Sequence, residues 1–185
     1  RQENNLASMH PDIVARLLKD NETFIAFTKK NDEYHQFPSF VVGNPIQNEV
    51  RVTIQHAIGD DKPIWKSEQV AAGLKNKNNT HALNIERDGT YRISCRRWPK
   101  ECSGPILGVP DENPKNWFSY TPISPEKVRI SIANQIFEKS IKSNDHEVVF
   151  MVNLEKGKTF LVTDFIEGES KYGVYYSYIS RVDSN

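Results

Sequence analysis

The sequence predicts a mainly β fold, an antiparallel β-sandwich of jelly-roll type preceded by an N-terminal α-helix. The first observation is that several segments beyond residue 46 alternate apolar and polar residues, the period of two of a strand with one buried face. The second is that turn residues separate these segments, as in all-β sandwiches. The third is length, because 185 residues bury roughly 70% of the unfolded chain's surface and form a real core.

The N-terminal helix is expected to begin at His10–Asp12. Pro11 occupies an early position that needs no N–H donor, and Asp12 lies in the first turn, where the helix dipole favours a negative charge. The apolar residues that follow keep helical spacing but cover more than one narrow stripe. They are Ile13, Val14, Leu17, Leu18, Phe24, Ile25 and Phe27. This breadth predicts contact on two sides, one with the chain's own core and one with a neighbouring domain.

A domain boundary is expected near residue 45. Residues 29–36 are polar, and residues 37–45 form an extended stretch punctuated by proline and glycine. We therefore divide the chain into residues 1–45, a helix and linker that would dock on a neighbouring domain, and residues 46–185, the β-sandwich module.

Strands are expected wherever the apolar residues alternate. The segments are 50–54, 83–85, 89–96, 128–132, 148–154, 160–166 and 174–178. Asp88 and Gly89 supply a turn before the third segment, and residues 155–158 and 167–170 are hairpin turns of a C-terminal meander. Residues 102–125 hold five of the ten prolines and show no periodicity. They predict a long surface loop that Trp117, Phe118 and Tyr120 are available to anchor.

The strand at residues 89–96 ends in an unusual cationic and aromatic cluster. Alternation fails where Arg97 falls on the buried side, and Pro99 then removes a hydrogen-bond donor, so we expect a bulge or bend. The candidate ligand-binding residues are Arg96, Arg97, Trp98 and Lys100. Arginine forks suit sulfate and an indole face suits a sugar ring. The interpretation that we favour is structural, with the arginine satisfied by backbone carbonyls or a carboxylate and the indole packed.

Several stretches together resemble the C-terminal region of bacterial arylsulfatase-like sulfatases. They are Gly89–Glu101 (Gly-Thr-Tyr-Arg-Ile-Ser-x-Arg-Arg-Trp-Pro-Lys-Glu), Gly173–Ile179, Asn4–Ala7 and His10–Val14, which together span nearly the whole chain. The resemblance implies a non-catalytic accessory domain of a sulfuric ester hydrolase, periplasmic or extracellular. Such a domain packs beside the catalytic domain of the same polypeptide and lines its substrate cleft.

The resemblance also implies that the chemistry lies outside these residues. Calcium and formylglycine belong to the family's catalytic domain, and neither Cys95 nor Cys102 stands in the Cys-x-Pro-x-Arg context that formylglycine requires. We assign no catalytic residue, metal ligand or cofactor to this chain and expect it to be inactive alone. Both cysteines are expected to be free structural thiols, with a local disulfide between them as the alternative.

Charge and composition narrow the choice of partners. The 24 basic and 24 acidic residues cancel, so there is no electrostatic case for nucleic acid or an anionic membrane. No apolar run approaches the roughly 18 to 20 residues of a transmembrane helix.

The alternative function is a carbohydrate-binding module that recognises sulfated glycans. Strand and turn sequences such as Asp-Gly-Thr-Tyr-Arg-Ile also suit sugar-binding jelly rolls. Exposure of the tryptophans distinguishes the two readings. Trp65, Trp98 or Trp117 open in a groove would favour binding, whereas burial of all three would favour a structural module.

Overall fold

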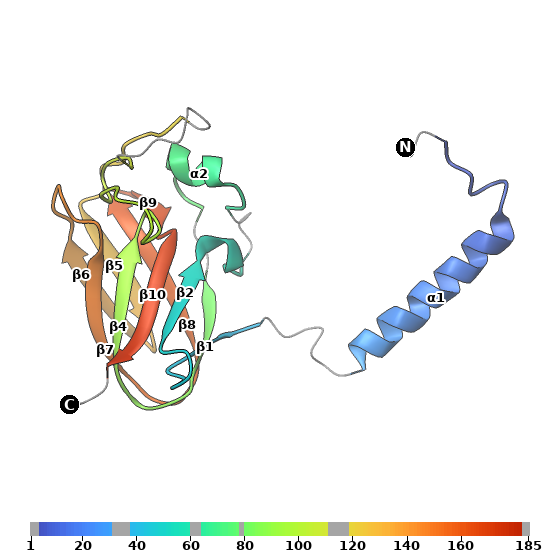
Figure 1. The fold of residues 1–185 in the computed structure, drawn as a ribbon, viewed down its shortest axis with the longest axis horizontal. Coiled ribbons are helices and arrows are strands. Elements are labelled where there is room, and N and C mark those ends of the chain that lie inside the picture. The colour runs from blue at the N-terminus through green and yellow to red at the C-terminus, as the bar shows by residue number, and fades with distance from the viewer. Residues whose placement is uncertain (1–3, 31–37, 60–63, 78–79, 111–118, 183–185) are drawn as a thin grey trace. The chain divides into compact units, whose positions relative to one another are not determined.

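A computed structural model describes residues 4–30, 38–59, 64–77, 80–110 and 119–182. The chain forms two compact units, Arg1–Pro38 and Ser39–Asn185 (Figure 1). The second unit contains every strand found in the described ranges.

The first unit contains the expected N-terminal helix, α1 (Pro11–Lys29). Pro11 lies at the start, Asp12 in the first turn and Lys29 in the last turn, so both charges complement the helix dipole. No residue of α1 is buried. Leu17 and Leu18 are each 57% exposed and Phe24 is 65% exposed, so the broad apolar surface of the helix is uncovered.

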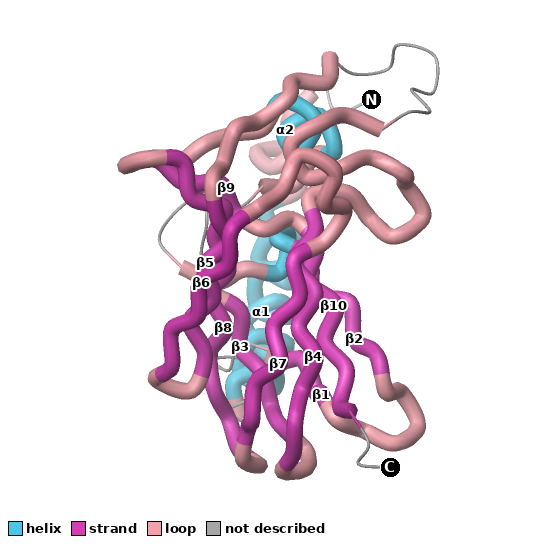
Figure 2. Tube along the Cα trace, turned by 90° about the vertical axis from the view of Figure 1, so that its left-hand side faces the viewer, coloured by secondary structure: helices cyan, strands magenta, loops and turns pink. Residues whose placement is uncertain are grey.

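The second unit is a β-sandwich, as the sequence predicted, with two sheets stacked face to face (Figure 2). One sheet has the order β1-β3-β8-β5-β6, with β9 paired to β8, and the other has the order β2-β10-β4-β7. The strands are β1 (Phe40–Val42), β2 (Glu49–Thr53), β3 (His81–Ile85), β4 (Gly89–Arg96), β5 (Lys127–Ile132), β6 (Gln135–Ser140), β7 (Val148–Leu154), β8 (Gly157–Glu167), β9 (Ser170–Gly173) and β10 (Tyr176–Val182). Pairing is antiparallel except between β1 and β3, which run parallel.

The core lies between the sheets and follows the predicted alternation. Along β4, Tyr91, Ile93 and Cys95 are fully buried, and β5 contributes Val128 and Ile130 from the opposite sheet. Burying each such aliphatic side chain stabilises the fold by about 1.5–3 kcal/mol. The alternating strands therefore hold the two layers together.

Three strands and one helix were not predicted from the sequence. Strand β6 is an edge strand with no buried residue, so it carries no alternation, and β1 and β9 are only three and four residues long. Helix α2 (Ser67–Ala72) lies where no periodicity was visible. It begins where Gln69 Oε1 accepts the Lys66 backbone N–H at 2.9 Å, and it ends at Gly73, whose φ of 64° is left-handed.

The boundary between the units lies earlier in the chain than residue 45, where the sequence placed it. The second unit starts at Ser39, because Phe40–Val42 pair with Leu83–Ile85 as strand β1. These residues looked like a linker because a three-residue strand is too short to show alternation.

The proline-rich stretch after β4 packs more closely than a surface loop. Ile106 is fully buried and Ile123 is 4% exposed, and both belong to the main core. A second, smaller apolar cluster contains the buried residues Ile54, Ile64, Val70, Trp98 and Tyr175. Of the expected anchors of the loop, Tyr120 packs against this cluster, while Trp117 and Phe118 lie outside the described residues.

Candidate functional site

Arg97 lies fully buried just beyond the end of β4. Its guanidinium donates to four backbone carbonyls: from Nη1 to Gly108 at 3.0 Å, and from Nη2 to Thr121 at 2.6 Å, Ala71 at 3.1 Å and Val70 at 3.4 Å. Burial lowers the pKa of Arg97 to about 10, which leaves the side chain charged at neutral pH. Arg97 therefore ties α2 to both described ends of the proline-rich stretch.

Trp98 is also directed into the protein and is only 5% exposed. Its Nε1 donates to the carbonyls of Pro105 at 3.1 Å and Gly108 at 3.3 Å. The Arg97 guanidinium lies 4.4 Å from the centre of the indole, and the Tyr120 ring lies at 5.7 Å. The N–H of the indole is therefore hydrogen-bonded within the protein, and its ring packs against Arg97 and Tyr120.

Arg96 and Lys100 lie nearer the surface, and both contact carboxylates. Arg96 is 9% exposed, and its Nη1 lies 3.8 Å from Glu147 Oε2. Lys100 Nζ donates to Glu49 at 2.6 Å and lies 4.5 Å from the centre of the Tyr178 ring. The structure brings the four sequence candidates together at one end of β4, where each of them already contacts groups of the protein.

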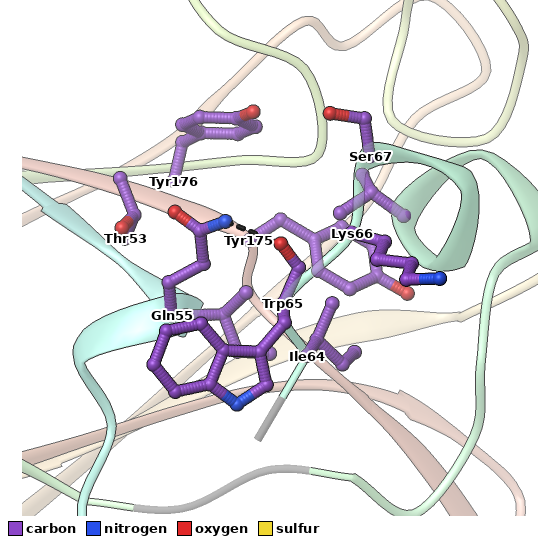
Figure 3. Close-up of a pocket in the computed structure, with 10 residues that line it drawn as sticks. Thr53, Gln55, Ile64, Trp65, Lys66, Ser67, Tyr175 and Tyr176 are labelled. Atoms are coloured by element: carbon purple, nitrogen blue, oxygen red, sulfur yellow. Dashed lines mark hydrogen bonds between the residues drawn. The ribbon is translucent and has the colours of Figure 1, made fainter. Parts of the chain in front are cut away.

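A pocket of about 120 Å³, partly open to solvent, lies beside helix α2 (Figure 3). It is formed by the end of β2, the start of α2 and the segment that leads into β10. The lining residues are Thr53, Ile54, Gln55, Ile64, Trp65, Lys66, Ser67, Val70, Tyr175 and Tyr176. Its apolar wall belongs to the same cluster that buries Trp98.

Trp65 presents an exposed indole on a fixed backbone at this pocket. The residue is 65% exposed, whereas the preceding Ile64 is 1% exposed and anchors the chain. The Trp65 N–H donates to Gln69 Oε1 at 2.8 Å, and its carbonyl accepts from Gln55 Nε2 at 2.6 Å. Because both backbone polar groups are held, the backbone of Trp65 loses little conformational freedom when a ligand contacts the ring.

Polar side chains line the same pocket as Trp65. Figure 3 shows the Gln55 side chain lying between Tyr176 and Trp65. The side-chain nitrogen of Gln55 donates a hydrogen bond to the Trp65 carbonyl, and its side-chain oxygen Oε1 can accept one. Tyr176 is half-buried, and burial raises the pKa of its phenol, which therefore remains a neutral donor and acceptor at pH 7. Two aromatic rings with an amide between them can hold a ring that has an apolar face and a polar edge.

The inner wall of the pocket is closed by Tyr175, which is 1% exposed. Its hydroxyl has no hydrogen-bond partner within the described residues, and burial raises its pKa to about 12. The phenol is therefore neutral, and the wall carries no negative charge.

The sequence named Trp65 only as one of three tryptophans whose exposure would matter, and it gave no reason to join Trp65 to Gln55 or Tyr176. Pairing of β2 with β10 brings the end of β2 beside Tyr176, and the hydrogen bond from Gln55 Nε2 to the Trp65 carbonyl attaches Trp65 to that end. One local signal was present: Gln69 stands three residues after Lys66, the spacing of a helix-capping side chain.

The described residues offer no metal centre. No group of three or more His, Cys, Asp or Glu among them could hold a metal ion. Calcium and formylglycine, which the sulfatase resemblance implies, would belong to a catalytic domain outside this chain. Cys95 and Cys102 are both free thiols, and Cys95 is buried. Of the helices within the described ranges, none is both long enough and apolar enough to span a membrane.

No protein-family model matches the chain, and no curated protein is similar to it in sequence. Several solved structures are similar in backbone. A family 35 carbohydrate-binding module from Clostridium thermocellum has a TM-score of 0.43 and 14% identity, over 72% of this chain and 98% of the module. A ruminal GH26 endo-β-1,4-mannanase has a TM-score of 0.40 and 11% identity, over 74% of this chain. A Podospora anserina GH26-CBM35 β-(1,4)-mannanase has a TM-score of 0.40 and 13% identity, over 75% of this chain. The chain spans 26% and 28% of the length of these two mannanases.

Proposed function

We propose that the β-sandwich unit is a non-catalytic accessory module that binds carbohydrate through the pocket at Trp65. The observation that carries the proposal is the exposed indole of Trp65 at a pocket with polar lining residues. The backbone of Trp65 is held there by hydrogen bonds with the side chains of Gln55 and Gln69. A sugar ring has a C–H face that packs on an indole and hydroxyl groups that need partners at its edge. Gln55 and Tyr176 supply such partners.

The sulfatase resemblance gives this module a proposed context. In a protein of that kind, the module lies beside a catalytic domain with calcium and formylglycine, in the periplasm or outside the cell. Its contribution is to hold a glycan near the substrate cleft, while the ester bond is broken elsewhere. The 185-residue chain by itself is then expected not to hydrolyse sulfate esters.

Binding is tested by affinity electrophoresis of the 185-residue chain through gels that contain single polysaccharides, both neutral and anionic. We expect retardation by at least one polysaccharide. Trp65→Ala is expected to weaken it about tenfold or more, since a buried aromatic contact at the centre of a site dominates affinity. Phe160→Ala is the matched control, because Phe160 is also an exposed aromatic, at 60%, but lies on β8 away from the pocket. Migration unaffected by every polysaccharide, or equal retardation of the Trp65→Ala chain, would refute the proposal.

A second candidate function is structural packing against a catalytic domain. It is favoured by helix α1, whose apolar residues are all left unburied within the described residues. The test is hydrogen exchange on the isolated chain. Amides of α1 are expected to exchange much faster than those of β7, because the helix lacks its tertiary partner. Equal protection of the two segments would contradict the docking role.

A further inference from the structure

Resting on the proposed function, we infer that the Trp65 pocket selects an anionic sugar residue, one that carries a sulfate or a carboxylate, and that Lys66 binds the anion. The inference goes beyond general carbohydrate binding because it assigns the charge of the ligand and the residue that recognises it.

The charges of the lining residues carry this inference. Lys66 is the one ionised side chain among the ten residues that line the described pocket, and none of the ten is Asp or Glu. Lys66 makes no ion pair with any carboxylate in the described part of the chain, unlike Lys75, Lys100, Lys127 and Lys171. Among the described lining residues, none carries a negative charge that would compensate Lys66.

The balance of donors and acceptors points the same way. Lys66 carries three donors, and Ser67 and Tyr176 each add a hydroxyl that can donate or accept, whereas the Thr53 hydroxyl is paired with His56 Nδ1 at 2.9 Å. Gln55 Oε1 also accepts, which leaves the Lys66 ammonium and the Trp65 indole N–H as the lining groups that can only donate. Every hydroxyl of a neutral sugar is itself a donor that needs an acceptor. A sulfate or carboxylate only accepts, and its hydrogen bond with an ammonium is charge-assisted, so it complements Lys66 better than a neutral hydroxyl does.

Position supports the assignment of the anion to Lys66. The residue directly follows Trp65 in the chain, and its backbone N–H is held by Gln69 at 2.9 Å, so the lysine stem starts from a fixed point. Figure 3 shows Trp65 and Lys66 extending to different sides of the pocket, with the Lys66 amine on the side of Ser67. A ligand that contacts both the indole and the amine must therefore extend across the pocket.

The test uses the same electrophoresis with three matched polysaccharides: κ-carrageenan, which is sulfated, its chemically desulfated form, and polygalacturonate, which carries carboxylates. We expect one or both anionic polymers to retard the chain more than desulfated carrageenan does. Retardation by κ-carrageenan alone identifies a sulfate site, and retardation by polygalacturonate alone identifies a carboxylate site. Raising the ionic strength is expected to weaken the retardation, because an exposed charge contact is screened.

The matched variants are Lys66→Gln and Lys156→Gln, a second exposed lysine, located in the turn between β7 and β8. Lys66→Gln is expected to weaken binding of the anionic polymer about threefold to tenfold, in the range of a single exposed charge contact, and Lys156→Gln to leave it unchanged. Equal weakening by both variants would show non-specific attraction and overturn the inference.

The two proposals fail in different ways. Strong binding of desulfated carrageenan that depends on Trp65 but not on Lys66 would overturn the anion inference and leave carbohydrate binding in place. Failure of all three polymers and of the neutral panel to retard the chain would overturn both. Binding of an anionic polymer that needs Lys66 but not Trp65 would support the anion site and overturn the stacking role of the indole.

Discussion

Replacing Arg97 by alanine should destabilise the sandwich unit by about 3–5 kcal/mol. Four carbonyls lose a donor, but three of them keep another: Val70 O accepts from Gly73 N at 3.2 Å, Ala71 O from Thr121 N at 2.9 Å, and Gly108 O from the Trp98 indole at 3.3 Å. The carbonyl of Thr121, at 2.6 Å from Arg97, is the one for which the described residues offer no substitute.

The magnitude has two parts. Leaving the Thr121 carbonyl unpaired costs about 1–3 kcal/mol. Removing a fully buried long side chain leaves a cavity and loses contacts, at a cost of about 2 kcal/mol or more. Arg97→Met separates the two parts because methionine fills much of the volume. It also removes a buried charge that has no carboxylate partner among the described residues, which offsets part of the loss, so we expect only about 1–3 kcal/mol.

The assay is urea unfolding followed by far-ultraviolet circular dichroism, with Arg129→Ala as the control. Arg129 is ion-paired with Glu138 at 2.6 Å, but its side chain is 44% exposed, so its loss should cost less than about 1 kcal/mol. The midpoint should fall in the order control, Met variant, Ala variant, with an unchanged slope. Midpoints for both Arg97 variants within error of the control would refute the structural role of the buried guanidinium.

Three further predictions concern Trp98, Glu147 and the thiols. Trp98→Ala should cost about 3–5 kcal/mol because the indole is 5% exposed, whereas Trp65→Ala should barely change the urea midpoint. Desolvation opposes ionisation of Glu147, but hydrogen bonds from Ser94 and Arg92 outweigh it and lower its pKa below 4.5. This stabilisation is complete above pH 4.5 and is lost as the pH falls through the folded-state value, so Glu147→Gln should flatten the acid-side decline in melting temperature. Burial raises the pKa of Cys95, so iodoacetamide should alkylate Cys102 first in the folded chain, and mass spectrometry that found Cys95 modified first would contradict this.

The sequence alone determined the sandwich and the inward face of its long strands. Tyr91, Ile93 and Cys95 alternate because a strand with one buried face requires it, and the same argument located β5, β7 and β8. It failed for β6, because an edge strand with a single partner need not bury either face. It failed also for β1, because three residues are too few for any period.

The tertiary structure alone decided the candidate site. From the sequence, packing was the favoured role of Arg97 and Trp98 and ligand contact the alternative, but residue type does not fix the direction of a side chain beyond a strand end. Carbonyls from α2 and from both described ends of the proline-rich stretch turn Arg97 inward, and these segments meet only after folding. Trp65 carried no pattern in the chain. Its place in the same pocket as Tyr176 depends on the pairing of β2 with β10, a long-range contact that local sequence does not encode.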